Sequence, residues 1–194
     1  MRGKFIVLEG IDGSGKSTQA KKLSSWLEAF THTPTICTYE PNIFREILLN
    51  HSLDKFTELL IFLADRNEHA SRIILPSLEA GHNVICERWN ASTLAYQNTP
   101  TAESLIELCN FPRPDAEIYL DISPEEAVKR IRQRGKMADK FEAQGLPYLT
   151  EVLSRYREIS QSQRMIRVKC EGLTEDETFT QIAQKLGEKL CQSR

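Results

Sequence analysis

The chain has 194 residues and a formal net charge of -2 at neutral pH. This length allows one domain with one buried core over residues 1–194, and the nearly balanced charge disfavours a nucleic-acid polymer as the ligand. Its five cysteines are widely spaced without a CxxC pair, and no long apolar or targeting segment appears, so we expect a cytoplasmic protein with no disulfide framework, zinc site or membrane partner.

The first predicted element is an apolar strand that runs into a glycine-rich loop. Residues 10–17 read GIDGSGKS and fit the pattern GxxxxGK[ST] at every specified place. The glycines let successive backbone N–H groups point at phosphate oxygens, and Lys16 reaches the outer phosphates. The hydroxyl of Ser17 suits Mg²⁺, and the helix that follows presents its positive end to the anion. We therefore predict a phosphate-binding loop.

Further along the chain, strand and helix patterns alternate. Apolar strand patterns occur at residues 4–9, 35–39, 83–87, 117–121 and 166–170, with helical patterns between them. This alternation predicts an α/β fold with a five-stranded parallel sheet flanked by helices. Because ligands on such sheets bind beyond the carboxyl ends of the strands, we expect the remaining chemistry there.

Helical patterns cover residues 43–49 and 54–79. Arg45 lies in the first of these patterns, where it is either a solvent-exposed helix charge or a phosphate-binding residue. Phe62 and Arg66 lie four residues apart on one face of the second. An aromatic ring beside a guanidinium fits a planar nucleobase, although a core phenylalanine beside a surface arginine gives the same pattern.

The third strand ends in an adjacent carboxylate and guanidinium, Glu87 and Arg88. A carboxylate at this edge can hold the water shell of a metal ion or take a proton, and an arginine can bind a transferring phosphate. Residues 91–97 then carry polar groups at helical spacing. No NKxD sequence occurs, which argues against a regulatory GTPase.

A basic run follows the fourth strand. Six lysines and arginines lie between Lys129 and Lys140, interrupted by Gly135. Such a run is usually a solvated helix end. Next to a phosphate site, a basic lid over about residues 130–145 that folds onto the phosphates and excludes water is the interpretation we favour.

Taken in order, the motifs resemble the thymidylate kinases of the bacterial type, within the nucleoside monophosphate kinases. They are LEGIDGSGKSTQ at 8–19, EP at 40–41, FLADR at 62–66, ERWNASTLAYQ at 87–97, RPD at 113–115 and RIRQRGKMADKFE at 130–142. The resemblance implies a three-layer P-loop NTPase fold with a basic lid. It also implies transfer of the γ-phosphate of ATP to dTMP in dTTP synthesis, with Mg²⁺, by a homodimer.

The resemblance also assigns roles to single residues. The ATP contacts are Gly10, Ile11, Asp12, Gly13, Ser14, Gly15, Lys16, Ser17 and Thr18. The dTMP contacts are Asp12, Arg45, Phe62, Arg66, Arg88, Ser92, Thr93 and Tyr96. The catalytic residues are Lys16, Arg88, Asp12, Arg132, Arg134 and Lys140, and the metal contacts are Ser17 and Glu87. Three features depart from the family pattern. Glu87 replaces its usual aspartate, and Tyr39 replaces an arginine that is often present. The run between Pro41 and Arg45 is shorter than usual and lacks the usual glycines, which bears on the role of Arg45.

Two other functions fit parts of the pattern. A deoxynucleoside kinase or another monophosphate kinase can share the loop, but a nucleoside kinase needs a general base near a 5′-hydroxyl, whereas a monophosphate kinase needs cations such as Arg88 and Arg45 for an existing phosphate. A nucleotide-binding switch has no second nucleotide to hold. The basic run and the pair Phe62 and Arg66 therefore argue against a switch.

Overall fold

The fold is built on one parallel sheet, as the computed structural model shows for residues 2–39, 43–133 and 145–192. Five strands lie in the order β2-β3-β1-β4-β5, and every neighbouring pair is parallel. The strands are β1 (Phe5–Glu9), β2 (Thr35–Thr38), β3 (Asn83–Glu87), β4 (Ala116–Asp121) and β5 (Ile166–Lys169). The predicted five-stranded parallel sheet is confirmed.

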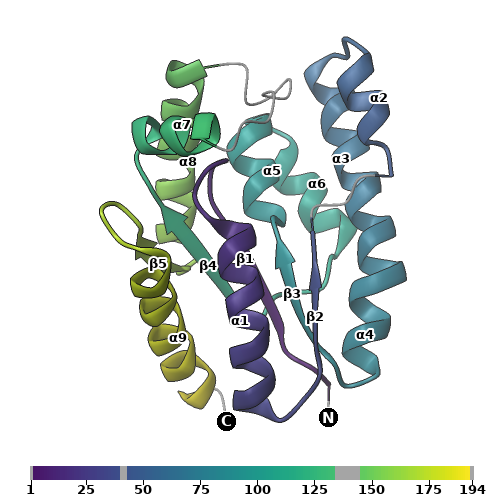
Figure 1. Cartoon of the computed structure of the whole chain (residues 1–194). Helices are drawn as coiled ribbons and strands as arrows, with labels where there is room; N and C mark the ends of the chain where they lie inside the picture. The colour runs from purple at the N-terminus through teal and green to yellow at the C-terminus, as the bar shows by residue number, and fades with distance from the viewer. Residues whose placement is uncertain (1, 40–42, 134–144, 193–194) are drawn as a thin grey trace.

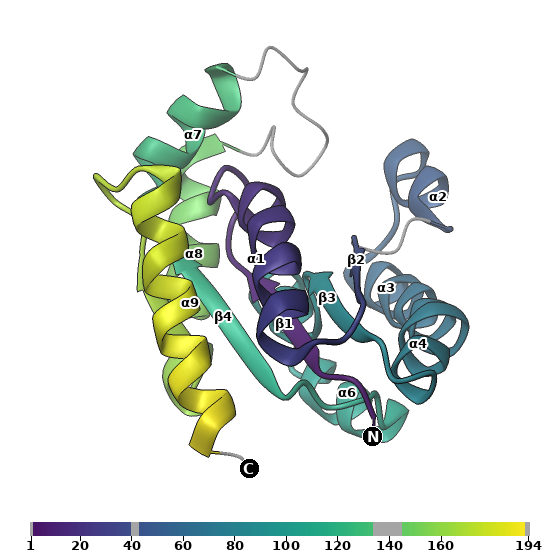
Figure 2. The same cartoon turned by 60° about the horizontal axis from the view of Figure 1, so that its bottom comes forward.

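Helices cover both faces of the sheet, which gives three layers. Their bounds are α1 (Lys16–Thr31), α2 (Arg45–Asn50), α3 (Lys55–His69), the π-helix η1 (Ala70–Ile74), α4 (Leu75–Glu79), α5 (Asn90–Gln97), α6 (Ala102–Cys109), α7 (Pro124–Gln133), α8 (Gly145–Ser162) and α9 (Glu175–Gln192). Helices α1 and α9 lie side by side on one face, and α5, α6 and α8 lie on the other (Figures 1 and 2). Within the described ranges, no helix is long and apolar enough to span a membrane.

Strand β1 is buried on both faces, and successive side chains enter different clusters. Phe5 and Val7 pack with apolar residues of α3, η1 and α4. Ile6 and Leu8 join a larger cluster that includes side chains of α1, α8 and α9. Burial of each such side chain stabilises the fold by about 1.5–3 kcal/mol. This packing fixes the carboxyl end of β1, from which the glycine-rich loop departs.

The helical pattern over residues 54–79 is correct in extent, but the helix is not uniform. It begins at its cap Asp54, whose Oδ1 accepts hydrogen bonds from the N–H groups of Phe56 (3.0 Å) and Thr57 (3.1 Å). It widens into the π-helix at Ala70–Ile74 before α4. We attribute the wide turn to Pro76, which has no N–H to donate and whose ring crowds the carbonyl one turn earlier.

Several predicted boundaries shift by one or two residues. Strand β2 ends at Thr38 and strand β5 at Lys169, each one residue earlier than predicted. Helix α6 did not emerge from the sequence pattern. It spans only about two turns between Pro100 and Asn110, which is too short for a helical period to stand out in the sequence, and Leu108 on it is 81% exposed.

Candidate active site

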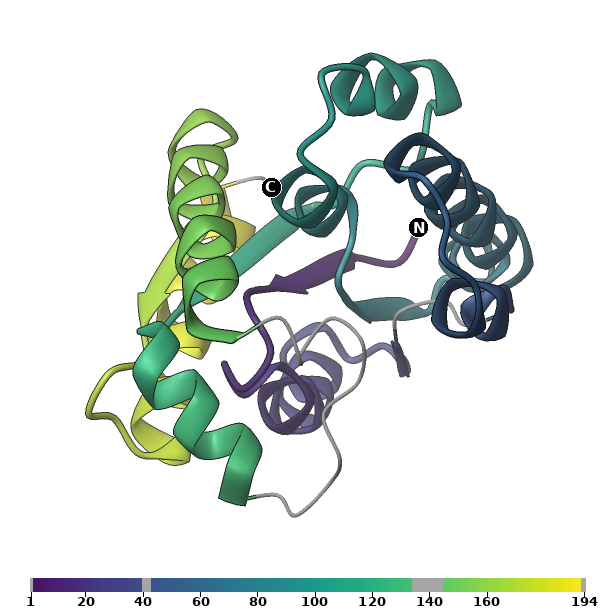
Figure 3. The ribbon, with the colours of Figure 1, turned by 90° about the horizontal axis from the view of Figure 1, so that it is seen from above.

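The glycine-rich loop lies at the carboxyl ends of the strands, between α7 and α8 on one side and α2 and α3 on the other (Figure 3). Gly13 shapes it in two ways. Its backbone is left-handed, with φ 82°, and a Cβ at this position would lie 2.5 Å from the carbonyl oxygen of Ala127 in α7. Only glycine therefore lets α7 pack directly against the loop.

Lys16 begins α1 and folds back over the loop. Its Nζ donates to the carbonyl oxygens of Gly10 and Ile11, both at 3.0 Å. Burial, and after it the charge of Arg88, lowers the pKa of Lys16 to about 8, although Asp12 partly opposes the shift. The ammonium group is thus held by weak backbone acceptors, and phosphate oxygens entering the loop would be stronger partners.

Ser17 and Glu87, the two predicted metal contacts, lie within hydrogen-bond distance of each other. The exposed hydroxyl of Ser17 donates to Oε2 of the buried Glu87 at 2.8 Å. A hydroxyl beside a carboxylate at a helix start is a donor set that suits Mg²⁺, which prefers oxygen ligands and keeps most of its waters. The extra methylene of Glu87 relative to aspartate still lets the carboxylate reach the loop.

Asp12, Arg88 and Tyr96 form a compact charged cluster above the loop. Nη2 of Arg88 donates to Oδ1 of Asp12 at 2.5 Å, and the Tyr96 hydroxyl donates to Oδ2 at 3.1 Å. The guanidinium carbon of Arg88 also lies 4.9 Å from the centre of the Tyr96 ring. Burial opposes ionisation of Asp12, but the charges of Arg88 and Lys16 outweigh it and hold the pKa of that carboxyl well below its usual range.

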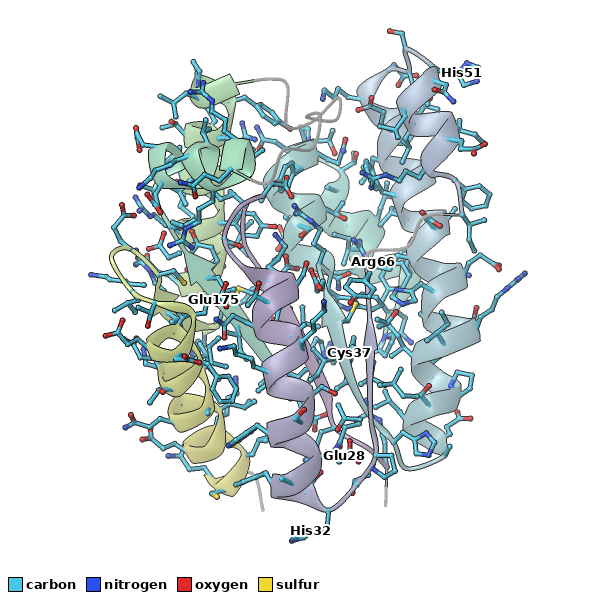
Figure 4. All side chains as sticks on the ribbon, viewed as in Figure 1. Glu28, His32, Cys37, His51, Arg66 and Glu175 are labelled. Atoms are coloured by element: carbon cyan, nitrogen blue, oxygen red, sulfur yellow. The ribbon has the colours of Figure 1, made fainter. Side chains whose placement is uncertain are left out.

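Arg66 points from α3 toward the sheet and α5 (Figure 4). Its guanidinium donates to Oγ1 of Thr93 at 2.7 Å and to the carbonyl oxygen of Trp89 at 2.8 Å, and it packs over the Trp89 ring. These hydrogen bonds fix the plane of the Arg66 guanidinium group. Burial, followed by the charge of Arg66, lowers the pKa of His69 to about 4, so the imidazole nearby is neutral at neutral pH.

A cavity of about 360 Å³ adjoins the loop on the side of α7 and α9. Arg130 and Gln133 of α7 line one wall, and Thr174 lines another. Gln19 of α1 holds the start of α9 in place, because its Nε2 donates to the carbonyl oxygen of Glu175 at 2.9 Å. The size of the cavity and its position beside the loop suit the base and sugar of a bound nucleotide.

The structure brings most of the predicted site residues together around the loop and the end of β3. They are Asp12, Lys16, Ser17, Glu87, Arg88, Ser92 and Tyr96. Arg45 begins α2 and Phe62 is half-buried on α3, and their contacts with a substrate remain predictions. Arg132 is exposed near the end of α7, whereas Arg134 and Lys140 lie outside the described residues.

The sequence patterns missed several residues of the site. Arg130 and Gln133 of the cavity wall fall within the basic segment predicted at about 130–145, but Thr174 was missed, because it lies more than a hundred residues from the loop and belongs to no motif. Glu9 and Tyr156 are buried polar residues behind Arg88. A glutamate at the end of an otherwise apolar strand was the available signal for Glu9, since buried carboxylates occur where donors surround them.

Known proteins resemble this chain along most of its length. A family model described as thymidylate kinase matches residues 8–182. The thymidylate kinase of Caldicellulosiruptor saccharolyticus is 35% identical over 192 residues, covering 91% of this chain and 92% of the relative. The probable thymidylate kinase of Pyrococcus abyssi is 43% identical over 154 residues, which cover 72% of this chain and 75% of the relative. A crystal structure of thymidylate kinase from Ehrlichia chaffeensis superposes with a TM-score of 0.73 at 25% identity, covering 96% of this chain and all of the other.

Proposed function

The chain belongs to the thymidylate kinase family, and we propose that it transfers the γ-phosphate of ATP to dTMP, giving ADP and dTDP, at the carboxyl end of its sheet. One observation carries the placement of the reaction. Arg88 is held by Asp12 and Tyr96 close to the loop that bears Lys16, so a cation for an acceptor phosphate stands beside a site for donor phosphates. Release of ADP from ATP that depends on added dTMP tests the proposal.

The donor side consists of the loop and the adjoining cavity. ATP would place its phosphates against the loop N–H groups and its adenosine in the cavity between α7 and the start of α9. Lys16 would then exchange the carbonyl oxygens of Gly10 and Ile11 for phosphate oxygens. Ser17 and Glu87 would hold Mg²⁺, which when bound neutralises charge on the phosphates.

The acceptor side lies across the cluster of Asp12, Arg88 and Tyr96. Arg88 would bind the phosphate of dTMP, since a guanidinium fork matches phosphate oxygens. Asp12, Tyr96 and Ser92 would face the sugar and phosphate. The base would lie against Phe62 and Arg66 on α3, with Thr93 alongside. Arg45 is the second candidate for the acceptor phosphate.

Transfer requires the two phosphates in line, with charge stabilised as it spreads over the moving group. Positioning and electrostatics supply most of the rate in such reactions. We assign the stabilising charge to Lys16 and Arg88. Further cations would come from Arg132 and from Arg134 and Lys140, which lie outside the described residues.

We also propose a homodimer in the cytoplasm. Phe56 and Leu60, one turn apart on one face of α3, are large apolar side chains that are exposed. A second copy packed on this face would bury them. The cytoplasmic assignment follows from the substrates, because ATP and deoxynucleotides are used where they are made. Sedimentation of the purified protein, with Leu60→Glu as the disrupting variant, tests the dimer.

The pH dependence of catalysis should report the depressed pKa of Lys16. We expect kcat/KM for ATP to fall as the pH rises through about 8, because Lys16 in the free enzyme loses its proton there. Bound phosphates favour the charged form, so kcat at saturating ATP should hold to a higher pH. Steady-state kinetics from pH 6.5 to 9.5 check both curves, and a kcat/KM for ATP that stays level across pH 8 would contradict the assignment.

Arg66→Ala should weaken dTMP binding and leave ATP nearly unaffected. Loss of a charged donor to the base costs about 1.5–3 kcal/mol, which is roughly a tenfold to hundredfold rise in KM for dTMP. The variant should also unfold at a lower temperature, because Arg66 ties α3 to Thr93 and Trp89. Arg72→Ala, which removes an exposed pair with Glu68 on the same helical segment, is the control. A higher KM for ATP with an unchanged KM for dTMP would show that the donor and acceptor sites are the other way round.

A further inference from the structure

A fully buried carboxylate lies directly behind the proposed phosphate-binding arginine. Glu9 is the last residue of β1, and its side chain has no exposed surface. Oε1 accepts from the backbone N–H groups of Trp89 (2.7 Å) and Ser92 (3.2 Å). Oε2 accepts from the hydroxyls of Ser92 (2.5 Å) and Tyr156 (3.1 Å). With four donors, both oxygens of this buried carboxylate are satisfied by hydrogen bonds.

The two backbone donors determine the conformation of the chain around Arg88. Arg88 has a left-handed backbone with φ 67°, which costs a residue with a side chain on the order of 1 kcal/mol or more. Its own N–H donates to the carbonyl oxygen of Leu8 at 2.9 Å, and the next N–H, of Trp89, donates to Glu9. Residues of β1 thus accept hydrogen bonds from the backbone N–H groups of Arg88 and Trp89, and these two bonds hold Arg88 in its left-handed conformation.

The hydroxyl donors determine the surroundings of the guanidinium. Because the Ser92 hydroxyl gives its proton to Glu9, its oxygen presents lone pairs to Nη1 of Arg88 at 3.4 Å. The Tyr156 oxygen lies 2.7 Å from the same Ser92 oxygen and supports this orientation from α8. Burial, and then the charge of Glu9, raises the pKa of the Tyr156 phenol well above its usual value, so the hydroxyl remains a donor.

We propose that Glu9 and Tyr156 are positioning residues for the acceptor phosphate, which act through Ser92 and the backbone of Trp89 to hold the Arg88 fork in its binding orientation. Neither residue touches the substrate. Tyr156 lies on α8, the helix that follows the basic run, so the network also connects that side of the site to Arg88. The proposal rests on the function proposed for Arg88 as the ligand of the dTMP phosphate.

A general role in stability predicts a different result from a role in phosphate binding. If the network only filled the core, its loss would weaken every ligand alike or none. If it orients Arg88, its loss should weaken dTMP, which has a phosphate, and leave thymidine, which has none, unchanged. The ratio of the two dissociation constants therefore separates the roles.

The experiment measures binding of dTMP and of thymidine by calorimetry to the full chain and its variants. Glu9→Gln is nearly the same size but puts an N–H₂ group where a carboxylate oxygen accepted, so either the backbone donors or the hydroxyls lose their acceptor. We expect the Kd for dTMP to rise by about tenfold to a hundredfold and that for thymidine by less than about twofold. Tyr156→Phe should raise the Kd for dTMP about threefold to tenfold, again without an effect on thymidine.

Tyr119→Phe is the matched control. Tyr119 is also fully buried, stacks on the ring of Tyr156, and donates its hydroxyl to a carboxylate, that of Asp121, at the same 3.1 Å. Its loss removes an equivalent hydrogen bond that has no connection to Arg88, so the ratio of the two constants should stay at the wild-type value.

Equal losses for dTMP and thymidine in Tyr156→Phe, or no loss of dTMP binding in it, would overturn the proposal, and this variant gives the answer even if Glu9→Gln does not fold. Failure of the proposed function would look different. In that case the unmodified protein itself would bind thymidine as tightly as dTMP.

Discussion

Lys16→Ala is expected to lower kcat by on the order of 10³ or more while the protein stays folded. In the proposed reaction the side chain would supply positive charge to the transferring phosphoryl group, where a preformed, water-poor site makes electrostatic stabilisation strong. Its structural contribution is small by comparison, because the described bonds of Nζ go to the loop carbonyl oxygens of Gly10 and Ile11. Coupled measurement of ADP release, together with thermal unfolding of the variant, checks both parts of the prediction.

The control for this variant is Lys21→Ala, an exposed lysine on the same helix. It removes the same charge from α1 at a distance from the loop, so its kcat should stay within about twofold of the wild type. Near-native turnover by a folded Lys16→Ala protein would show that the loop lysine does not serve the reaction.

Arg88→Met should lower kcat/KM for dTMP by about 10²–10³, comparable to loss of one preorganised donor in a catalytic site. The methionine retains much of the buried stem and removes the fork. Arg88 lowers the pKa of both Asp12 and Lys16, so the pKa of each group should be higher in the variant. Its acid limb and its alkaline limb in kcat/KM should each move to higher pH.

Arg155→Met is the matched control, since this arginine of α8 donates to the carbonyl oxygen of Ala95 at 2.9 Å and pairs with Glu151 on the surface. Its pH profile should follow the wild type. If Arg88→Met kept the wild-type KM for dTMP and the wild-type pH limits, the acceptor phosphate would have to bind elsewhere.

The parts of the site that sequence alone predicts are those encoded locally. The loop at residues 10–17 is a contiguous motif, and the strand and the helix predicted beside it are present. The pairing of Ser17 with Glu87 is not local but could also be predicted, because parallel strands place their carboxyl ends at one edge, Glu87 ends β3, and Ser17 follows the loop that leaves β1. The expected i, i+4 placement of Phe62 and Arg66 on α3 holds for the same local reason.

The network behind Arg88 could not be predicted in this way. Glu9 and Tyr156 are 147 positions apart in the sequence, and their contact exists only once α8 has packed beside α5. The left-handed backbone of Arg88 is similarly invisible, since arginine has no preference for it and the surrounding hydrogen bonds impose it. The π-helix at Ala70–Ile74 gave one local signal, Pro76, whose effect depends on how the neighbouring turns relax.

Arg66 shows how a motif can hide a second role. The pattern predicts a donor to a base, and the structure adds bonds from the same guanidinium to Thr93 and to the Trp89 carbonyl oxygen. One side chain thus ties α3 to the segment that carries Arg88. Losses of dTMP binding on its removal must therefore be compared with losses of thermal stability before they are assigned to the base.

The most direct measurement is release of ADP from ATP in a coupled assay, with dTMP, dCMP, AMP, GMP and thymidine compared as acceptors under identical conditions. We expect dTMP to give a kcat/KM at least about 100-fold above each of the others, because in the proposed site Arg88 would select a phosphate and Arg66 would select the base. Phosphorylation of thymidine in preference to dTMP, or of AMP or GMP at a comparable rate, would contradict the assignment of the acceptor site.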